Sequence, residues 1–145
     1  MLSRIKFAGL AVLVAGLFLY AGIAQAQEKA ATVLAKGEIH KADKAGSGTV
    51  TLYQLADGKR VLRLTDFSVD NGPDLHVRLI AANDAKNTTS VAKTDHVELG
   101  QLKGNKGSQN YDVPANVDLS KYRVVSIWCN RFSVNFAAAP LTAGK

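Results

Sequence analysis

The sequence predicts one small, all-β domain. In the second part of the chain, hydrophobic residues alternate with polar ones at a period close to two, and the spacing of an amphipathic helix is almost absent. Many of these residues are β-branched or aromatic, which is typical of strands. Asp57-Gly58 and Asn71-Gly72-Pro73 separate the alternating segments and are turn formers. We therefore expect an antiparallel β-sandwich or barrel-like domain.

The beginning of the chain is expected to be a cleaved signal peptide. Arg4 and Lys6 give a basic start, residues 7–24 are uncharged and rich in Leu, Val and Ala, and Ala24-Gln25-Ala26 has the pattern of a cleavage site. The mature chain would begin at Gln27 and lie in the periplasm or outside the cell. The alternative is an uncleaved membrane anchor, because about 18 apolar residues are near the lower limit for crossing a bilayer.

Removal of residues 1–26 leaves 119 residues, a length that supports a single hydrophobic core. We expect an N-terminal linker at residues 27–35 and the β domain at residues 36–141. The removed segment carries two of the 18 basic residues and none of the 12 acidic ones, so the mature chain has a net charge of +4. The lysines are spread out and the aromatic residues lie in apolar alternations, which argues against a nucleic-acid partner.

The first predicted element is a hairpin. Residues 49–55 alternate, Asp57-Gly58 supplies the turn, and residues 60–67 form the second strand. After the turn formers of residues 70–74, another strand is predicted over residues 75–80. One face of this strand should be buried and the other solvated, because its apolar and polar residues alternate: Leu75, Val77 and Leu79 against His76 and Arg78.

The remaining elements are expected to be a surface loop, a short strand, a glycine-rich turn and a long final strand, at residues 81–94, 96–99, 103–108 and 122–136. The apolar positions of the final strand shift by one residue along its length. Under strict alternation, the first apolar set cannot share a face with the second. The first set is Val125, Ile127 and Cys129, and the second is Phe132, Val134 and Phe136. Either the strand is covered on both faces, or a bulge near Asn130-Arg131 shifts its register.

Cys129 is the single cysteine, so it cannot close an internal disulfide. It is either a buried small hydrophobe or a site of chemistry. As a site it could act as a redox thiol or as a haem ligand, with His76 as the candidate second ligand. The pattern Cys-x-x-Cys-His is absent and the only Met is the initiator, which excludes a c-type or Met-ligated haem. A domain without any cofactor is equally compatible with the sequence.

The sequence contains few motifs of other enzyme classes or metal sites. The sequence has no Gly-x-Ser-x-Gly elbow, no phosphate-binding glycine loop and no paired zinc cysteines, so a redox or binding module is favoured over a stand-alone enzyme. The three histidines, His40, His76 and His96, lack metal-ligand spacing and are expected at the surface or in structural roles. Asp66, Asp70 and Asp74 could hold calcium, although turn and strand-end roles explain them as well.

Seven blocks of the chain resemble, in order, the DM-thirteen domain family, which occurs alone in bacteria and beside DOMON domains in animal surface proteins. These blocks are Gly37-Glu38-Ile39-His40, Gly48-Thr49-Val50, residues 61–67, Asn71-Gly72-Pro73-Asp74-Leu75, residues 99–104, residues 109–114, and Val125-Ser126-Ile127-Trp128-Cys129 to Phe132. The resemblance covers nearly the whole of the predicted mature chain.

The resemblance implies an extracytoplasmic β domain that takes part in electron transfer or oxidative modification. Its signature cysteine, proposed in the family to act as a thiol or as a ligand to a group such as haem, matches Cys129. No cytochrome or DOMON segment accompanies the domain, so a redox partner would be a separate protein. Four further family positions have structural explanations: Gly72 and Pro73 form a turn, and Tyr111 and Trp128 fill a core. The alternative is a β domain that binds a ligand, calcium or a protein and contains a structural cysteine.

Overall fold

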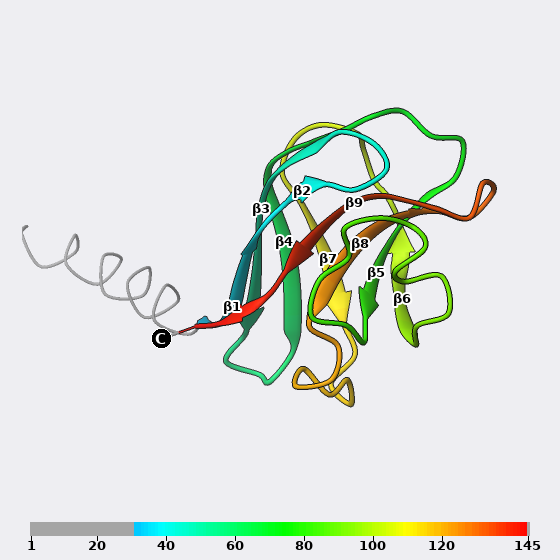
Figure 1. Ribbon diagram of the computed structural model, residues 1–145. Helices are drawn as coiled ribbons and strands as arrows, with labels where there is room; N and C mark the ends of the chain where they lie inside the picture. Colours follow the sequence, from blue (N-terminus) through cyan, green and yellow to red (C-terminus); the bar gives the residue numbers. More distant parts are fainter. Residues whose placement is uncertain (1–30, 145) are drawn as a thin grey trace, which may run out of the picture. The chain divides into compact units, whose positions relative to one another are not determined.

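The computed structural model describes residues 31–144, which form ten β-strands and no helix (Figure 1). The strands are β1 (Thr32–Glu38), β2 (His40–Lys41), β3 (Gly46–Gln54), β4 (Arg60–Val69), β5 (Leu75–Ile80), β6 (His96–Gln101), β7 (Gln109–Val113), β8 (Val124–Cys129), β9 (Val134–Pro140) and β10 (Thr142–Ala143). The predicted signal peptide at residues 1–26 lies outside the described residues. Within the described residues, no helix is long and apolar enough to cross a membrane.

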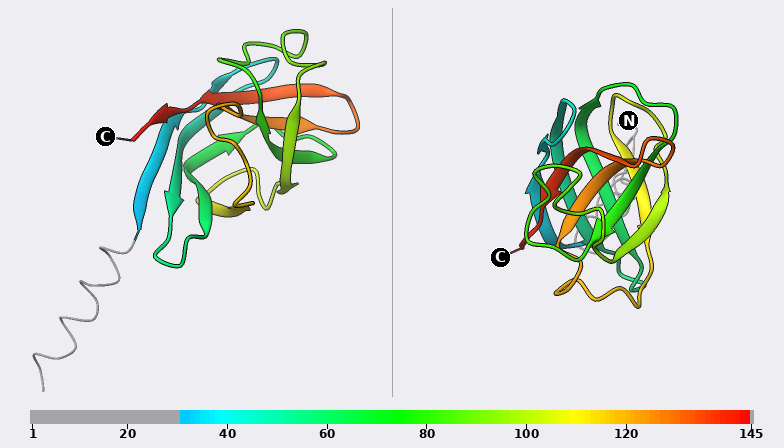
Figure 2. Two further views of the ribbon diagram at one scale, coloured as in Figure 1. Left: turned by 90° about the horizontal axis from the view of Figure 1, so that it is seen from below. Right: turned by 45° about the vertical axis from the view of Figure 1, so that its right-hand side comes forward.

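The strands form two antiparallel sheets of five strands each. Sheet A has the order β10-β1-β3-β4-β7, and sheet B has the order β2-β9-β8-β5-β6. Figure 2 shows β3 and β4 of sheet A and β8 and β9 of sheet B from two further directions. Residues of both sheets form one large hydrophobic cluster, in which Leu62 and Leu64 of sheet A meet Val77 and Ile127 of sheet B. The predicted β-sandwich is therefore confirmed.

The β3–β4 hairpin follows its sequence pattern. Val50 pairs with Leu64 and Leu52 pairs with Leu62, and all four side chains are fully buried. Each such side chain contributes about 1.5–3 kcal/mol through its removal from water. Gly58 in the connecting turn has a φ of 86°, a conformation that glycine adopts without steric strain. The predicted hairpin and its turn are both present.

The prediction of one long final strand over residues 122–136 is wrong. The chain instead forms two strands, β8 and β9, that pair with each other across a tight turn at residues 130–133. Ser133 in this turn has a φ of 52°. The parity of the apolar residues changes because the chain reverses direction between Cys129 and Val134, and not because of a bulge at Asn130-Arg131.

Strand β8 is nevertheless covered on both faces, as one of the two predicted alternatives required. All six of its residues are buried. Ile127 and Cys129 face the inter-sheet core, whereas Val124 and Trp128 belong to a second cluster on the outer face of sheet B. The loop at residues 81–94 supplies the cover for this second cluster through Ala85 and Val91. The predicted surface loop is thus also a packing element.

Four strands were not predicted from the sequence. Three of them, β2, β7 and β10, are short or polar, and the fourth, β1, is longer. Strand β1 starts at Thr32, inside the stretch expected to be a linker, because it pairs with β3 on one side and β10 on the other. Residues 32–35 of the expected linker therefore belong to β1. Strand β7 continues sheet A beyond β4.

Candidate functional site

Cys129 is the last residue of β8 and is fully buried, with 0% of its surface exposed. It pairs with Leu75 of β5 and with Val134 of β9, and its side chain belongs to the inter-sheet core. It is a free cysteine. In this arrangement the thiol packs as a small hydrophobic group, and a reagent in solution has no contact with it. Access to the sulfur requires a movement of the neighbouring chain.

Two turns lie beside Cys129 in the fold. The exposed turn at residues 130–133 follows it directly, and the Asn130 N–H donates a hydrogen bond to the Asp74 carbonyl at 2.9 Å. Asp74 ends the turn that contains Gly72 and Pro73. A methyl group at Gly72 would lie 2.7 Å from the Cδ2 atom of Leu75, the cross-strand neighbour of Cys129. A larger residue at this position would therefore displace the Leu75 side chain.

His76 does not lie near the thiol in a shared site. His76 pairs with Trp128, whereas its neighbour Leu75 pairs with Cys129. Because successive side chains of a strand point to opposite faces, His76 lies on the outer face of sheet B and Cys129 on the inner face. The two residues predicted as paired haem ligands are therefore separated by the sheet itself.

The structure also argues against haem at Cys129 in this conformation. An axial ligand needs space for a macrocycle over its sulfur atom, and the Cys129 side chain is enclosed by packed core residues. His76, on the other face, has both ring nitrogens in hydrogen bonds with carboxylates. The residues present do not fit a haem held by this pair.

His76 is the centre of a polar network on the outer face of sheet B. Its Nε2–H donates to Asp74 Oδ1 at 2.8 Å, and its Nδ1–H donates to Glu98 of β6. Ionised carboxylates only accept hydrogen bonds, so both contacts are satisfied when the imidazole carries two protons. Burial lowers the pKa of His76, but the hydrogen bonds and charges of Glu98 and Asp74 outweigh it and raise the pKa above 6.5.

Arg78 joins this network to β8. Its Nε–H donates to Glu98 Oε2 at 3.2 Å, and a terminal N–H donates to Asn130 Oδ1 at 2.7 Å. The guanidinium lies over the Trp128 ring, 4.9 Å from its centroid. Such a cation–π contact favours Arg over Lys because the planar group stacks on the ring. The network therefore connects the β6 edge strand to the turn that follows Cys129.

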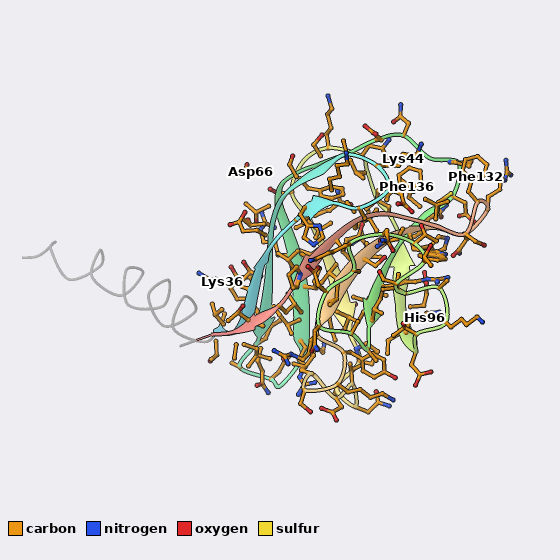
Figure 3. The ribbon with its side chains drawn as sticks, viewed as in Figure 1. Lys36, Lys44, Asp66, His96, Phe132 and Phe136 are labelled. Carbon is orange, nitrogen blue, oxygen red and sulfur yellow. The ribbon has the colours of Figure 1, made fainter. Side chains whose placement is uncertain are left out.

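Asp66, Asp70 and Asp74 do not form a common site. Asp66 lies in β4 with a φ of 50°, Asp70 accepts a hydrogen bond from the Ala45 N–H at 3.2 Å, and Asp74 binds His76. Among residues 31–144, no group of three His, Cys, Asp or Glu side chains is arranged to hold a metal ion. In Figure 3, Asp66 and His96 lie on different sides of the domain.

Tyr111 has a defined structural role in the loop after β6. Its hydroxyl accepts a hydrogen bond from the Lys103 N–H at 2.8 Å and donates one to Gln109 Oε1 at 2.5 Å. Gln109 in turn donates to the Gly104 carbonyl at 2.8 Å. The Tyr111 ring is buried in the inter-sheet core, and burial raises the pKa of its hydroxyl above 10.0. The ring and hydroxyl together fix the loop against sheet A.

A buried polar chain holds the loop at residues 81–94 over Trp128. The Ser126 hydroxyl donates to Asn135 Oδ1 at 2.7 Å, and the Asn135 side chain donates to the Ala85 carbonyl at 3.2 Å. His40 anchors the same loop through Asp84, at 2.7 Å. Burial lowers the pKa of His40, but the Lys41 carbonyl and the Asp84 carboxylate raise it above 6.5. These contacts are structural, and no sequence pattern predicts the pairing of Ser126 with Asn135 or of His40 with Asp84.

The family model described as "Electron transfer DM13" matches residues 38–141, well over half of the chain. The match spans every strand from β2 to β9, including Cys129, the His76 network and Tyr111. Searches of curated proteins and of solved structures found no match. The chain therefore belongs to the electron-transfer DM13 family.

Proposed function

We propose that this protein is an exported electron-transfer module in which Cys129 is the redox-active residue. The position of Cys129 carries the proposal: it is the last residue of β8, and the next four residues, 130–133, form an exposed turn. Opening this turn would uncover the thiol while the rest of both sheets remains paired. Local opening of this kind needs less free energy than global unfolding.

The redox step that suits a lone thiol is exchange with a disulfide of a separate protein. The Cys129 sulfur attacks one sulfur of that disulfide, a new S–S bond forms, the old one breaks, and the released thiol takes up the proton that Cys129 loses. Cys129 is thereby oxidised and half of the partner's disulfide is reduced. A thiol of a second protein then attacks the Cys129 sulfur, which releases the first partner as a dithiol. Another thiol of the second protein releases Cys129 as a disulfide forms in that protein, so two electrons pass from the second protein to the first. Such partners are present in the periplasm and outside the cell, where the predicted signal peptide would direct the chain.

Incubation of the native mature protein with oxidised glutathione tests this function. We expect intact-mass spectrometry to detect one glutathione added per chain, and dithiothreitol to remove it. Cys129→Ala should remain unmodified. A visible absorption spectrum before and after dithionite, recorded on the same preparation, tests the haem alternative. A native protein that stays unmodified until it is denatured would contradict the proposal, and so would a haem spectrum that requires Cys129.

The second candidate is an extracytoplasmic binding domain with a structural cysteine. The full burial of Cys129 among apolar side chains favours it. Under this alternative, Cys129→Ala would change stability but no other property. The two candidates therefore differ in a single measurable result, the reactivity of the native thiol.

A further inference from the structure

The end of the sandwich where β8 begins contains a pocket of about 400 Å³. Leu34, Leu52, Leu119 and Leu141 form its apolar walls, and Ser120 and Arg123 lie at its polar rim. Pockets of about 300–1,000 Å³ with apolar walls and a few polar groups are typical of small-molecule sites. The pocket is separated from Cys129 by the length of β8, because Arg123 precedes this strand and Cys129 ends it.

A bulge in β1 contributes to the pocket. The pairing of β1 with β3 passes from Val33–Tyr53 to Ala35–Leu52, which leaves Leu34 as an extra residue. Leu34 and Ala35 both line the pocket, although consecutive residues of a regular strand point to opposite faces. Bulges re-aim side chains in this way and are frequent beside functional sites. Leu52, which is fully buried, belongs to the core, so the pocket reaches the hydrophobic interior.

Arg123 is held at the rim by its backbone, while its side chain is exposed. The Arg123 N–H donates to the Ile80 carbonyl at 3.1 Å, and its carbonyl accepts from the Leu141 N–H at 2.7 Å. Arg60, Arg63 and Arg78 each donate to an oxygen atom of the domain. Within residues 31–144, the Arg123 guanidinium makes no such hydrogen bond and no ion pair. It is available to an anion from solution.

The acidic groups near the rim are already engaged. Asp118 accepts hydrogen bonds from the Ser120 N–H at 2.9 Å and the Ser120 hydroxyl at 2.6 Å. The Asp95 carboxylate binds Lys121 at 3.2 Å. Neither carboxylate lines the pocket. Among the described residues that line the pocket, Arg123 is the only charged one.

We propose that this pocket binds an amphiphile with an apolar chain and a carboxylate head, of the class of free medium-chain fatty acids. The chain occupies the space between Leu34, Leu52 and Leu119, and the carboxylate accepts paired hydrogen bonds from Arg123. Arg suits this role because its planar guanidinium matches a carboxylate with two parallel N–H donors. The proposal is independent of the redox function, since it involves neither Cys129 nor the His76 network.

Calorimetric titration of the mature protein with dodecanoate tests the proposal, with dodecanol as the uncharged probe. We expect saturable binding of one dodecanoate per chain and weaker binding of dodecanol. Arg123→Gln should weaken dodecanoate binding about fivefold, the effect of an exposed ion pair, and leave dodecanol binding unchanged. Arg131→Gln, at an exposed position in the β8–β9 turn, is the matched control and should bind like the wild type.

A second variant tests the apolar part of the site. Ala143 is exposed and lines the pocket, so Ala143→Trp should fill it and abolish binding of both probes without disturbing the core. Circular dichroism checks that each variant is folded. Absence of saturable binding, or equal binding by wild type, Arg123→Gln and Ala143→Trp, would overturn the proposal. Binding to phosphatidylglycerol vesicles without binding of free dodecanoate would also overturn it, because a lipid headgroup would then be the ligand.

Discussion

Trp128 and Cys129 are consecutive in β8 but pack in two different hydrophobic clusters. Cys129 faces the core between the sheets, and Trp128 lies on the outer face of sheet B under the loop at residues 81–94. Arg78 covers the same indole ring. Alternation along one strand thus places the thiol and the polar network on opposite sides of a single sheet.

Truncation of these two neighbours should have different consequences. Trp128→Ala removes a large buried side chain and should lower the free energy of unfolding by about 3–5 kcal/mol. Cys129→Ala removes one small group and should lower it by about 1 kcal/mol. Urea denaturation monitored by circular dichroism measures both changes in unfolding free energy. Tryptophan fluorescence cannot be the probe, because Trp128 is the only tryptophan and the first variant lacks it. Equal losses would mean that the outer cluster contributes little to stability.

His76 should make the stability of the domain depend on pH. Its pKa is raised above 6.5 in the folded state, so its contribution is fully present below the unfolded-state pKa and is lost as the pH rises through the folded-state value. The difference in unfolding free energy between wild type and His76→Gln should therefore be constant well below pH 6.5 and fall as the pH rises above 6.5. His96→Gln, at an exposed residue, is the control. If the difference in unfolding free energy between wild type and His76→Gln grew with pH instead, His76 would be neutral in the folded state.

The carboxylates beside His76 can be tested separately. Asp74→Asn and Glu98→Gln should each lower the pKa of His76, since each replaces a hydrogen-bonded carboxylate by an uncharged amide and so removes one negative charge. Titration of the imidazole resonances by nuclear magnetic resonance measures these shifts. A His76 pKa that is unchanged in both variants would contradict the network.

Gly72→Ala should destabilise the domain by about 1–3 kcal/mol, the usual effect of overpacking. The added methyl group would lie 2.7 Å from Leu75 Cδ2 and 3.0 Å from the Phe136 ring. Gly104→Ala is the matched control, because its methyl group would lie 3.6 Å from the Lys106 carbonyl, an ordinary contact. Thermal denaturation compares the two. Equal melting temperatures would mean that the turn at residues 70–74 yields without strain.

Tyr111→Phe should loosen the loop at residues 102–108 while the ring remains in the core. Loss of the hydroxyl removes the shorter of the two hydrogen bonds that the Lys103 N–H donates, which should cost about 1–2 kcal/mol. Hydrogen exchange at the Lys103 amide should accelerate, and exchange in β8 should change only as far as global stability does. Unaltered exchange at Lys103 would indicate that Gln109, which also accepts from this amide, is sufficient alone.

The strands that could be predicted are those with regular alternation. In β4 and β5 most buried residues alternate with partly exposed ones, and strong turn formers lie beside the β3–β4 hairpin and β5. Strand β7 has only Tyr111 and Val113 buried, so its five residues carry a weak pattern. The β8–β9 turn was missed because it has neither Gly nor Pro and contains Phe132, which is 59% exposed at the tip of the hairpin (Figure 3). From the sequence alone, an aromatic residue in an exposed turn cannot be distinguished from an aromatic residue in a strand.

The chemistry of the site was predictable only in part. Cys129 stood out because it is the single cysteine, but its burial depends on packing between two sheets. The contact of His76 with Glu98 depends on the register of β5 and β6, which shifts between Val77 and Arg78. Single-sequence patterns do not determine such a register. The family blocks include Cys129 and Asp74 but neither His76 nor Glu98, and they give no spatial relationships.

The rate at which native Cys129 reacts with oxidised glutathione tests the central claim most directly, when wild type and Val125→Ala are compared. Val125 lies in β8 and in the same core cluster as Cys129, and its truncation should reduce global stability by about 2 kcal/mol. If the turn at residues 130–133 opens locally, both proteins should react at the same rate. A rate about 30-fold higher in Val125→Ala would mean that the thiol is reached only by global unfolding, and would contradict a redox role for Cys129.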